Sequence, residues 1–460
     1  MARVNKKASK VSPKLSLTSY DLLRRSVMTS LLWEDQFYED GITHAERIKE
    51  YMNDVSKEEA ISILEEAKFS NKLRHTPLYL MTLMAKKGYL TSEEVAKIIT
   101  RVDDMSELIA LYNSDEDNKK MLPHCLTKGI AKAFTKFDEY QFSKYKGTKD
   151  KVKLRDVIRV AHPKPSSDEQ SLLWKKIIDN SLATPDTWEV ELSKSTNKNE
   201  SWTRLLTEKT DKGFSKLPSL ALLRNMRNII NANVDSKIVK EAIRNMDVSK
   251  ILPYQFITSS KYAPLYSEEL EKKFLECTSN MEKLPGSTII LLDASGSMEI
   301  TLSRKSSTTR GDVAVALGAI AKEICEEAII YRFNTNLSLI PSNVKGFSLI
   351  NEYKEGRGGT AVKKCAKKAI KLFKKANMGR YPTRVIVITD EQTNSDYITY
   401  NEPVRELENL PKCSHGYLIN VGAYEKGIDY TKHSGWTTIS GWSENILKYI
   451  SSYEEMMKKQ

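Results

Sequence analysis

Hydrophobic positions in the first part of the chain follow the spacing of amphipathic helices. From about residue 17 to 283, apolar residues recur at i, i+3, i+4 and i+7 over stretches of ten to twenty residues. Examples are SKEEAISILEEAKF, LTKGIAKAFTKFDEYQFSKY and LPSLALLRNMRNII, and the breaks between such stretches carry Pro, Gly, Asn or Asp. No segment shows the sustained alternation that is typical of strands. The pattern predicts an all-helical region.

The pattern changes near LPGSTII, at residues 284–290. STIILLDAS, AIIYRFN, TRVIVITD and GYLINVG are typical of short buried strands, and they alternate with the helix patterns DVAVALGAIAKEICEEA, GGTAVKKCAKKAIKLFKKAN, PVRELENL and SENILKYISSYEEMMKK. This alternation predicts a parallel sheet with helices on both faces. We therefore expect a basic tail (1–15), a helical domain (16–283) and an α/β domain (284–460).

Successive short helices over more than 260 residues favour an α-solenoid, in which each helix pair buries its apolar face on the next pair. The sequence contains no exact repeat period. An irregular helical domain therefore remains open at this point.

Composition narrows the class of protein. The chain has 460 residues, 40% of them apolar and 29% charged, as in soluble globular proteins of two or three domains. No stretch approaches eighteen uncharged apolar residues, and the first fifteen residues lack the apolar region of a signal peptide. Five scattered cysteines without a CxxC motif indicate reduced thiols and argue against zinc. We expect a cytoplasmic protein without a membrane span.

The whole chain carries a net charge of +12, and within the helical region the excess positive charge is concentrated in one segment. Residues 120–164 contain 12 basic and 4 acidic residues, whereas residues 1–283 as a whole contain 48 and 41. Lys128, Lys132 and Lys136 are spaced by four, so they share one face of a helix. Lysine and arginine contacts to phosphates give sequence-independent affinity for nucleic acid, and the interleaved Tyr140, Phe142 and Tyr145 could stack on unpaired bases. The alternative is a solvated charged face whose aromatic residues belong to the core.

Oxygen-bearing side chains follow the predicted strands of the α/β part. Asp293 ends one strand and is followed by Ser295 and Ser297, Thr360 follows a glycine-rich loop, and Asp390 ends another strand. Ligands of such sheets bind at the carboxyl ends of the strands. Two carboxylates with neutral hydroxyls suit a hard divalent cation, Mg²⁺ above all, and leave it able to accept an anionic oxygen from a partner. The alternative is that these residues only cap turns and helix ends.

Motifs of common enzymes are absent. The sequence contains no GxxxxGK[ST] loop, no GxSxG elbow and no kinase motif set. The Asp390–Glu391 pair could do acid/base work, but a metal ligand beside an exposed charge is the favoured interpretation. We expect a protein without catalytic residues, and a metal-dependent hydrolase is the third interpretation.

Two resemblances cover nearly the whole chain. Residues 284–460, with the DASGS, Thr360 and Asp390 arrangement, resemble a von Willebrand factor A domain with its metal-ion-dependent adhesion site. The first part resembles the TROVE module of the Ro autoantigen and its bacterial relatives in LLRRSVMTSLLWEDQFYEDG, KYKGTKDKVKLRDVIRVAHPKPS, TPDTWEVELS, LPSLALLRNMRNI and LPYQF. A TROVE module followed by an A domain is the architecture of that family.

The resemblance implies a ring of HEAT-like helical repeats closed by a Rossmann-like A domain. It implies that the outer surface binds small Y RNAs and that the central hole accepts single-stranded 3′ ends of misfolded RNAs. On the matching segment, the Y RNA contacts fall on Lys144, Lys146 and His162, with a further basic contact near Lys149. Arg24, Arg25 and the Lys128 stripe are candidates for the lining of the hole.

The leading hypothesis is thus a monomeric RNA chaperone or quality-control scaffold. Its metal site would bind another protein, with an exoribonuclease as one candidate. The runner-up is a metal-dependent protein-interaction module whose basic surface is incidental.

Overall fold

The structure is a computed structural model that describes residues 18–29, 41–114, 121–145, 152–209, 213, 215–301, 308–353, 358–390, 415–421, 436–440 and 445–458. These residues fall into two compact units, which we call the helical unit (18–195) and the mixed unit (196–458). The predicted helix PVRELENL lies outside the described residues. None of the described helices is both long and apolar enough to cross a membrane.

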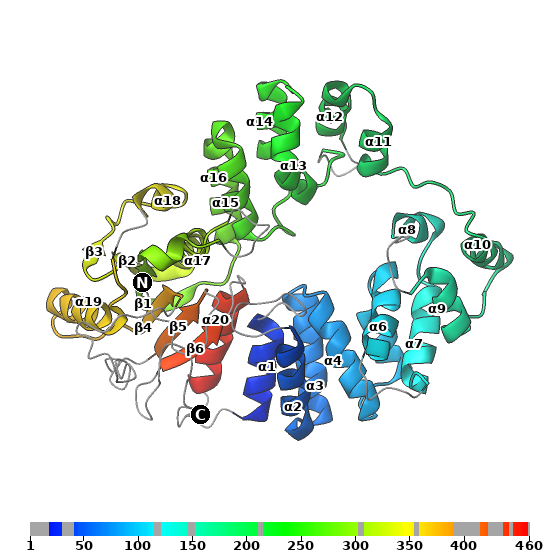
Figure 1. The fold of residues 1–460 in the computed structure, drawn as a ribbon, viewed down its shortest axis with the longest axis horizontal. Helices are drawn as coiled ribbons and strands as arrows, with labels where there is room; N and C mark the ends of the chain where they lie inside the picture. The colour runs from blue at the N-terminus through cyan, green and yellow to red at the C-terminus, as the bar shows by residue number, and fades with distance from the viewer. Residues whose placement is uncertain are drawn as a thin grey trace. The chain divides into compact units, whose positions relative to one another are not determined.

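The helical unit consists of short helices, and between residues 19 and 178 helices that are close in sequence are mostly also close in space (Figure 1). Packing runs mainly between adjacent and next-but-one helices, as in helical repeats. Its elements are α1 (Ser19–Thr29), α2 (Gly41–Tyr51), η1 (Met52–Asp54), α3 (Lys57–Glu65), η2 (Glu66–Ser70), α4 (His75–Lys86), α5 (Ser92–Ile98), α6 (Val102–Ser114), α7 (His124–Phe134), α8 (Glu139–Lys144), α9 (Leu154–Ala161), α10 (Asp168–Ile178) and α11 (Trp188–Lys194).

Side-chain caps decide where several of these helices begin. The side chains of Ser56 and Thr91 each accept a backbone N–H in the first turn of α3 and α5. In each case the side chain of the glutamate three residues later accepts the backbone N–H of the Ser or Thr. Asp138 does the same for α8 with Gln141. This cap breaks the long helix expected over 126–145 into α7 and α8.

An aromatic cluster holds α7, α8 and α10 together. The rings of Phe134 and Phe142 lie 4.7 Å apart, and Phe134 meets Trp174 edge-on at 5.6 Å. All three side chains are buried. Phe142 is therefore a core residue, and the possibility that it stacks on RNA bases is wrong.

Helices α5 and α7 approach so closely that one position between them has no room for a side chain. A Cβ atom on Gly129 of α7 would lie 2.4 Å from the Cβ of Val95. We expect Gly129→Ala to lower the free energy of unfolding of the helical unit by about 1–3 kcal/mol, because an extra methyl group forces the helices apart. Chemical denaturation followed by circular dichroism measures this. Lys128→Ala, on the exposed side of the same helix, is the control and should change stability by less than about 0.5 kcal/mol; equal effects would contradict the close packing.

The mixed unit begins with five helices and continues into a six-stranded sheet (Figure 1). The helices are α12 (Lys198–Thr207), α13 (Ser219–Asn231), α14 (Ser236–Arg244), α15 (Pro253–Tyr262) and α16 (Ser267–Ser279). The strands are β1 (Leu284–Asp293), β2 (Cys325–Phe333), β3 (Leu337–Leu339), β4 (Arg384–Thr389), β5 (His415–Asn420) and β6 (Trp436–Ser440). Their order is β3-β2-β1-β4-β5-β6, and all pairs are parallel except β2 with β3.

Helices cover both faces of the sheet, as the alternating pattern predicts. Alternate strand residues such as Ile289 and Val387 pack on α19 (Val362–Ala376). On the other face, Gly318 of α17 (Arg310–Ile324) lies against Leu292, and Tyr417 stacks edge-on with Tyr453 of α20 (Asn445–Lys458). The predicted fold class, a helical region followed by an α/β part, is confirmed. The edge strands β3 and β6 were not expected, and β2 begins at Cys325, where a helix was predicted to continue.

The last helices before the sheet pack directly on the α/β part. A carboxylate oxygen of Glu271 in α16 accepts the backbone N–H of Phe347 at 2.7 Å, and the Phe274 and Phe347 rings are 5.6 Å apart. Phe347 precedes α18 (Ser348–Glu352). The change from helices to strands at residue 284 therefore lies inside one compact unit.

Candidate functional site

Neighbouring parallel strands bring the two predicted carboxylates to one edge of the sheet. Leu292 of β1 pairs with Ile388 of β4, so Asp293, the last residue of β1, lies beside the end of β4, and Asp390 is the residue directly after β4. The hydroxyl of Thr389 donates to a carboxylate oxygen of Asp293. Both aspartates are fully buried.

The serines of the first loop link the two carboxylates. The backbone N–H of Ser295 donates to Asp293 Oδ1 at 2.9 Å, and the hydroxyls of Ser295 and Ser297 are 3.2 Å apart. Ser297 Oγ in turn donates to Asp390 Oδ1 at 3.1 Å. Four of the five predicted ligands therefore form one connected group of oxygens.

The loop that carries Thr360 adjoins this group. The backbone N–H of Gly296 points to the carbonyl of Gly358 at 3.5 Å, and Ala361 is held by the carbonyl of Asn334. Thr360 itself is 2% exposed. All three predicted loops thus meet at the carboxyl ends of the strands.

A buried arginine that the sequence analysis missed completes the site. Arg310, the first residue of α17, is 1% exposed. Its Nη1 donates to Asp390 Oδ2 at 2.7 Å and to the carbonyl oxygen of Ser297 at 3.3 Å. Nothing in the local sequence signals this contact, because the two residues are 80 positions apart.

Charge inside the site is only partly balanced. Burial and the nearby Asp390 carboxylate raise the pKa of Asp293 from 3.8 to about 7, against the hydrogen bonds from Thr389 and Ser295 that lower it. Two ionised carboxylates beside one guanidinium would carry a net charge of −1. An added cation would therefore stabilise the ionised form of Asp293.

The donor set fits a hard divalent cation. It consists of carboxylate and hydroxyl oxygens only, which Mg²⁺ prefers, and no group of three or more His, Cys, Asp and Glu side chains that could hold a metal occurs among the described residues. The four described cysteines, Cys125, Cys277, Cys325 and Cys365, are free thiols. The described part of the chain therefore contains no cluster of ligands for a softer metal ion such as zinc, whereas the oxygens around Asp293 and Asp390 suit magnesium.

Cations and tyrosines gather at the end of α8. The Lys144 ammonium lies 5.6 Å from the Tyr140 ring centre and 5.8 Å from that of Tyr145, and the Arg101 guanidinium lies 4.5 Å from Tyr145. Lys144 is exposed and Tyr140 is 46% exposed. We call these four residues the α8 cluster. It offers the charge of Lys144 and aromatic rings on one surface, while Asp103 holds the Arg101 guanidinium through hydrogen bonds of 2.9 and 2.8 Å.

The other predicted basic contacts have different surroundings. His162 is exposed and ends α9 in a left-handed conformation (φ 48°), and Lys128 is exposed on α7. Lys132 pairs with Glu93, and Lys136 donates to the carbonyl of Ala96, so both are engaged within the protein. Arg24 is held by Glu66 through two bonds of 2.6 and 2.7 Å, and Arg25 is half-buried. Lys146 and Lys149 lie outside the described residues. Their roles toward RNA stay predictions.

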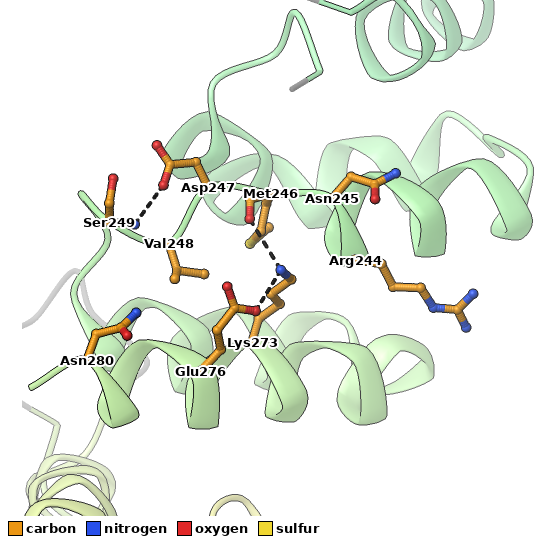
Figure 2. Close-up of a pocket in the computed structure, with 9 residues that line it drawn as sticks. All are labelled: Arg244, Asn245, Met246, Asp247, Val248, Ser249, Lys273, Glu276 and Asn280. Atoms are coloured by element: carbon orange, nitrogen blue, oxygen red, sulfur yellow. Dashed lines mark hydrogen bonds and ion pairs between the residues drawn. The ribbon is translucent and has the colours of Figure 1, made fainter. Parts of the chain in front are cut away.

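One pocket of about 390 Å³ lies between the end of α14 and helix α16 (Figure 2). Its charged groups are bonded to protein neighbours. Lys273 Nζ meets Glu276 at 2.8 Å and the carbonyl of Met246, and Arg244 meets Glu269 at 3.0 Å. It contains none of the predicted site residues, and its internal pairing favours a structural role.

Comparisons with known proteins agree with this organisation. The sequence model of the TROVE domain matches residues 95–182 and 179–326, which together make up half of the chain. The second match extends beyond residue 283 into β1 and α17. Among solved structures, the crystal structure of the Ro (RSR) protein of Deinococcus radiodurans is similar in fold, with a TM-score of 0.63 and 15% identity. The similarity covers 95% of this chain and 99% of that one.

Proposed function

Because this chain belongs to the TROVE-domain family of Ro-related proteins, we propose that it binds small noncoding RNA and does not itself catalyse a reaction. The observation that carries the proposal is the α8 cluster. It lies within the TROVE match and places exposed positive charge beside exposed aromatic surface. RNA phosphates bind to such positively charged side chains, and unpaired bases stack on such aromatic rings.

In this proposal a Y-like RNA lies on the outer surface of the helical repeats. Lys144, Lys146 and His162 contact it, with Lys149 nearby, and single-stranded 3′ ends of misfolded RNA enter the hole of a ring. The neighbour-to-neighbour packing of the helices supports a HEAT-like repeat. The ion pairs of Lys132 and Arg24 make Lys128 the strongest of the proposed hole contacts.

We further propose that the sheet and its helices form a von Willebrand factor A domain with a metal-ion-dependent adhesion site. Its parallel order with one antiparallel edge strand and the meeting of the three loops support this. Asp293, Ser295, Ser297, Thr360 and Asp390 would hold a divalent cation, whose chemistry is to accept an anionic oxygen from a partner protein such as an exoribonuclease.

The RNA proposal is tested by Lys144→Ala combined with His162→Ala. We expect binding of a Y-type RNA hairpin to weaken at least about tenfold, because a hydrogen bond to a charged group contributes about 1.5–3 kcal/mol. The slope of log K against log salt should fall by about one, since the variant lacks one lysine that neutralises a phosphate. Filter binding over a salt series measures both.

The matched control is Lys97→Ala combined with His75→Ala. It also removes one lysine and one histidine, but these side chains already pair with Glu65 and Glu107. Its affinity should stay near that of the unmodified protein. Unchanged binding by the Lys144/His162 variant would favour the runner-up, a metal-dependent protein-interaction module with an incidental basic surface.

A further inference from the structure

A second concentration of positive charge lies on α19, in the mixed unit. Residues 361–380 contain seven lysines, one arginine and no acidic residue, a net charge of +8 in twenty positions. Residues 120–164 also carry +8, and the whole chain carries +12, so all remaining residues together carry −4. The excess charge of this protein is therefore confined to two segments, one in each unit.

The lysines of α19 form rows on its outer side. Lys364, Lys368, Lys371 and Lys375 follow a spacing of 4, 3 and 4, which places them within one narrow stripe about 16 Å long. All four are exposed. Lys363, Lys367 and Lys374 form a second row beside them. We call these seven residues the α19 lysine face.

The positive charges of the α19 lysine face are not paired with carboxylates of the described residues. Among the described residues, no carboxylate pairs with any lysine of α19, whereas lysines of α16 in the same unit pair with Glu268 and Glu276 on their own helix. Like charges one turn apart destabilise a helix by a few tenths of a kcal/mol each, and lysines in the first turn oppose the helix dipole. Helix stability therefore does not explain the arrangement, but a polyanionic partner does.

The opposite side of α19 restricts what that partner can be. Its apolar residues, among them Cys365, Ala369 and Phe373, are buried against the sheet, and Leu372, on the lysine side, is 42% exposed. The buried residues cannot insert into a lipid surface, so α19 lacks the broad exposed apolar face of membrane-binding amphipathic helices. Beyond the helix end, Tyr381 is 56% exposed and lies 3.9 Å beneath the Lys374 ammonium. A cation over an exposed aromatic ring is a surface on which a nucleic acid base can stack.

We propose that the α19 lysine face binds the phosphate backbone of RNA and forms a second RNA contact, separate from the α8 cluster. The choice of RNA among polyanions rests on the proposed function. Lysine ammonium groups contact phosphates without reading bases, so this contact has no sequence preference. It gives the α/β part a role in holding RNA that is independent of its metal site.

The test replaces Lys364, Lys368, Lys371 and Lys375 with glutamine in the full chain, which keeps helix propensity. Binding of the same RNA hairpin should weaken at least tenfold. The salt slope should fall by about 0.9 for each phosphate that the removed lysines had neutralised, up to about 3.6. The control replaces Lys97, Lys176, Lys216 and Lys272 with glutamine, which removes the same charge from lysines that already pair with acids. This control should lose much less affinity.

The outcomes separate the two proposals. If only the Lys144/His162 variant is weakened, the α19 proposal fails and the proposed function stands; if only the α19 variant is weakened, the α19 contact stands and the α8 contact fails. Equal losses in the α19 variant and its control overturn the α19 proposal, because net charge alone then accounts for binding. Binding to phosphatidylcholine–phosphatidylserine vesicles that depends on the same lysines, without binding to RNA, overturns it in favour of a membrane surface.

Discussion

Arg310→Met is expected to lower the thermal unfolding midpoint of the mixed unit by roughly 6–20 °C when divalent metal is chelated. Arg310 and Asp390 form a salt bridge whose side chains are 1% and 0% exposed. Removing one partner of a buried pair costs about 3–5 kcal/mol, because the other charge stays buried without compensation. For a unit of this size, each kcal/mol lowers the midpoint by about 2–4 °C.

Divalent metal should reverse much of this loss. The site keeps the oxygens of Asp293, Ser295, Ser297 and Asp390 in the variant, and its net charge becomes more negative by one. A ligand that binds only the folded state stabilises it by RT ln(1 + [L]/Kd), so tighter binding gives a larger increase in midpoint. We expect Mg²⁺ or Mn²⁺ to raise the midpoint of Arg310→Met by more than that of the unmodified protein. Thermal melts in EDTA and in excess metal measure both.

This result would mean that Arg310 supplies, without metal, part of the positive charge that a bound cation would supply. It would also mean that the guanidinium weakens metal binding because it forms a salt bridge with Asp390. An identical loss of stability with and without metal would speak against a metal site formed by these residues.

The second large effect is expected at the opposite end of the sheet. Arg384, the first residue of β4, donates to Glu454 of α20 through Nε at 2.7 Å and through Nη2, and its Nη1 donates to Thr288 at 2.9 Å. The Tyr417 hydroxyl also donates to Glu454, and Arg384 is fully buried. Arg384→Met should cost about 3–5 kcal/mol and lower the midpoint by a similar 6–20 °C.

Metal should not restore the stability of Arg384→Met, so this variant is the control for Arg310→Met in the same sheet. Adding Glu454→Leu should recover part of the loss, because the unpaired carboxylate is then removed. A double variant that loses the full sum of both single effects would show that the two side chains do not act as a pair.

The metal ligands illustrate what local sequence can predict. Asp293 ends β1 and is followed by Ser295 and Ser297, Asp390 directly follows β4, and Thr360 lies in the loop that leads into α19. Parallel strands end at a common edge. Their proximity therefore follows from the strand–helix alternation. Arg310 gave no such signal, because its partner lies in another loop and its burial depends on how α17 packs on the sheet.

The basic residues illustrate the opposite case. Spacing of four correctly placed Lys128 and Lys132 on α7, but Lys136 lies beyond the end of that helix. Lys132 is engaged with Glu93, and Lys136 donates to the carbonyl of Ala96 on α5. Phe142 lies between tyrosines in the sequence and yet is buried beside Phe134. The lysines of α19 show in the sequence as a run of charge, but only their exposure and lack of acidic partners among the described residues distinguish them from other surface lysines.

By itself, the sequence determined the helical first part, the α/β second part and the set of oxygens at the strand ends. These follow from periodicity and from strand geometry, which act over a few residues. Tertiary structure decided which charges are compensated: the burial of Arg310 beside Asp390, the pairing of Arg384 with Glu454, and the exposed lysines of α19. Electrostatic energy depends on distances and burial between residues far apart in the chain, which no local pattern specifies.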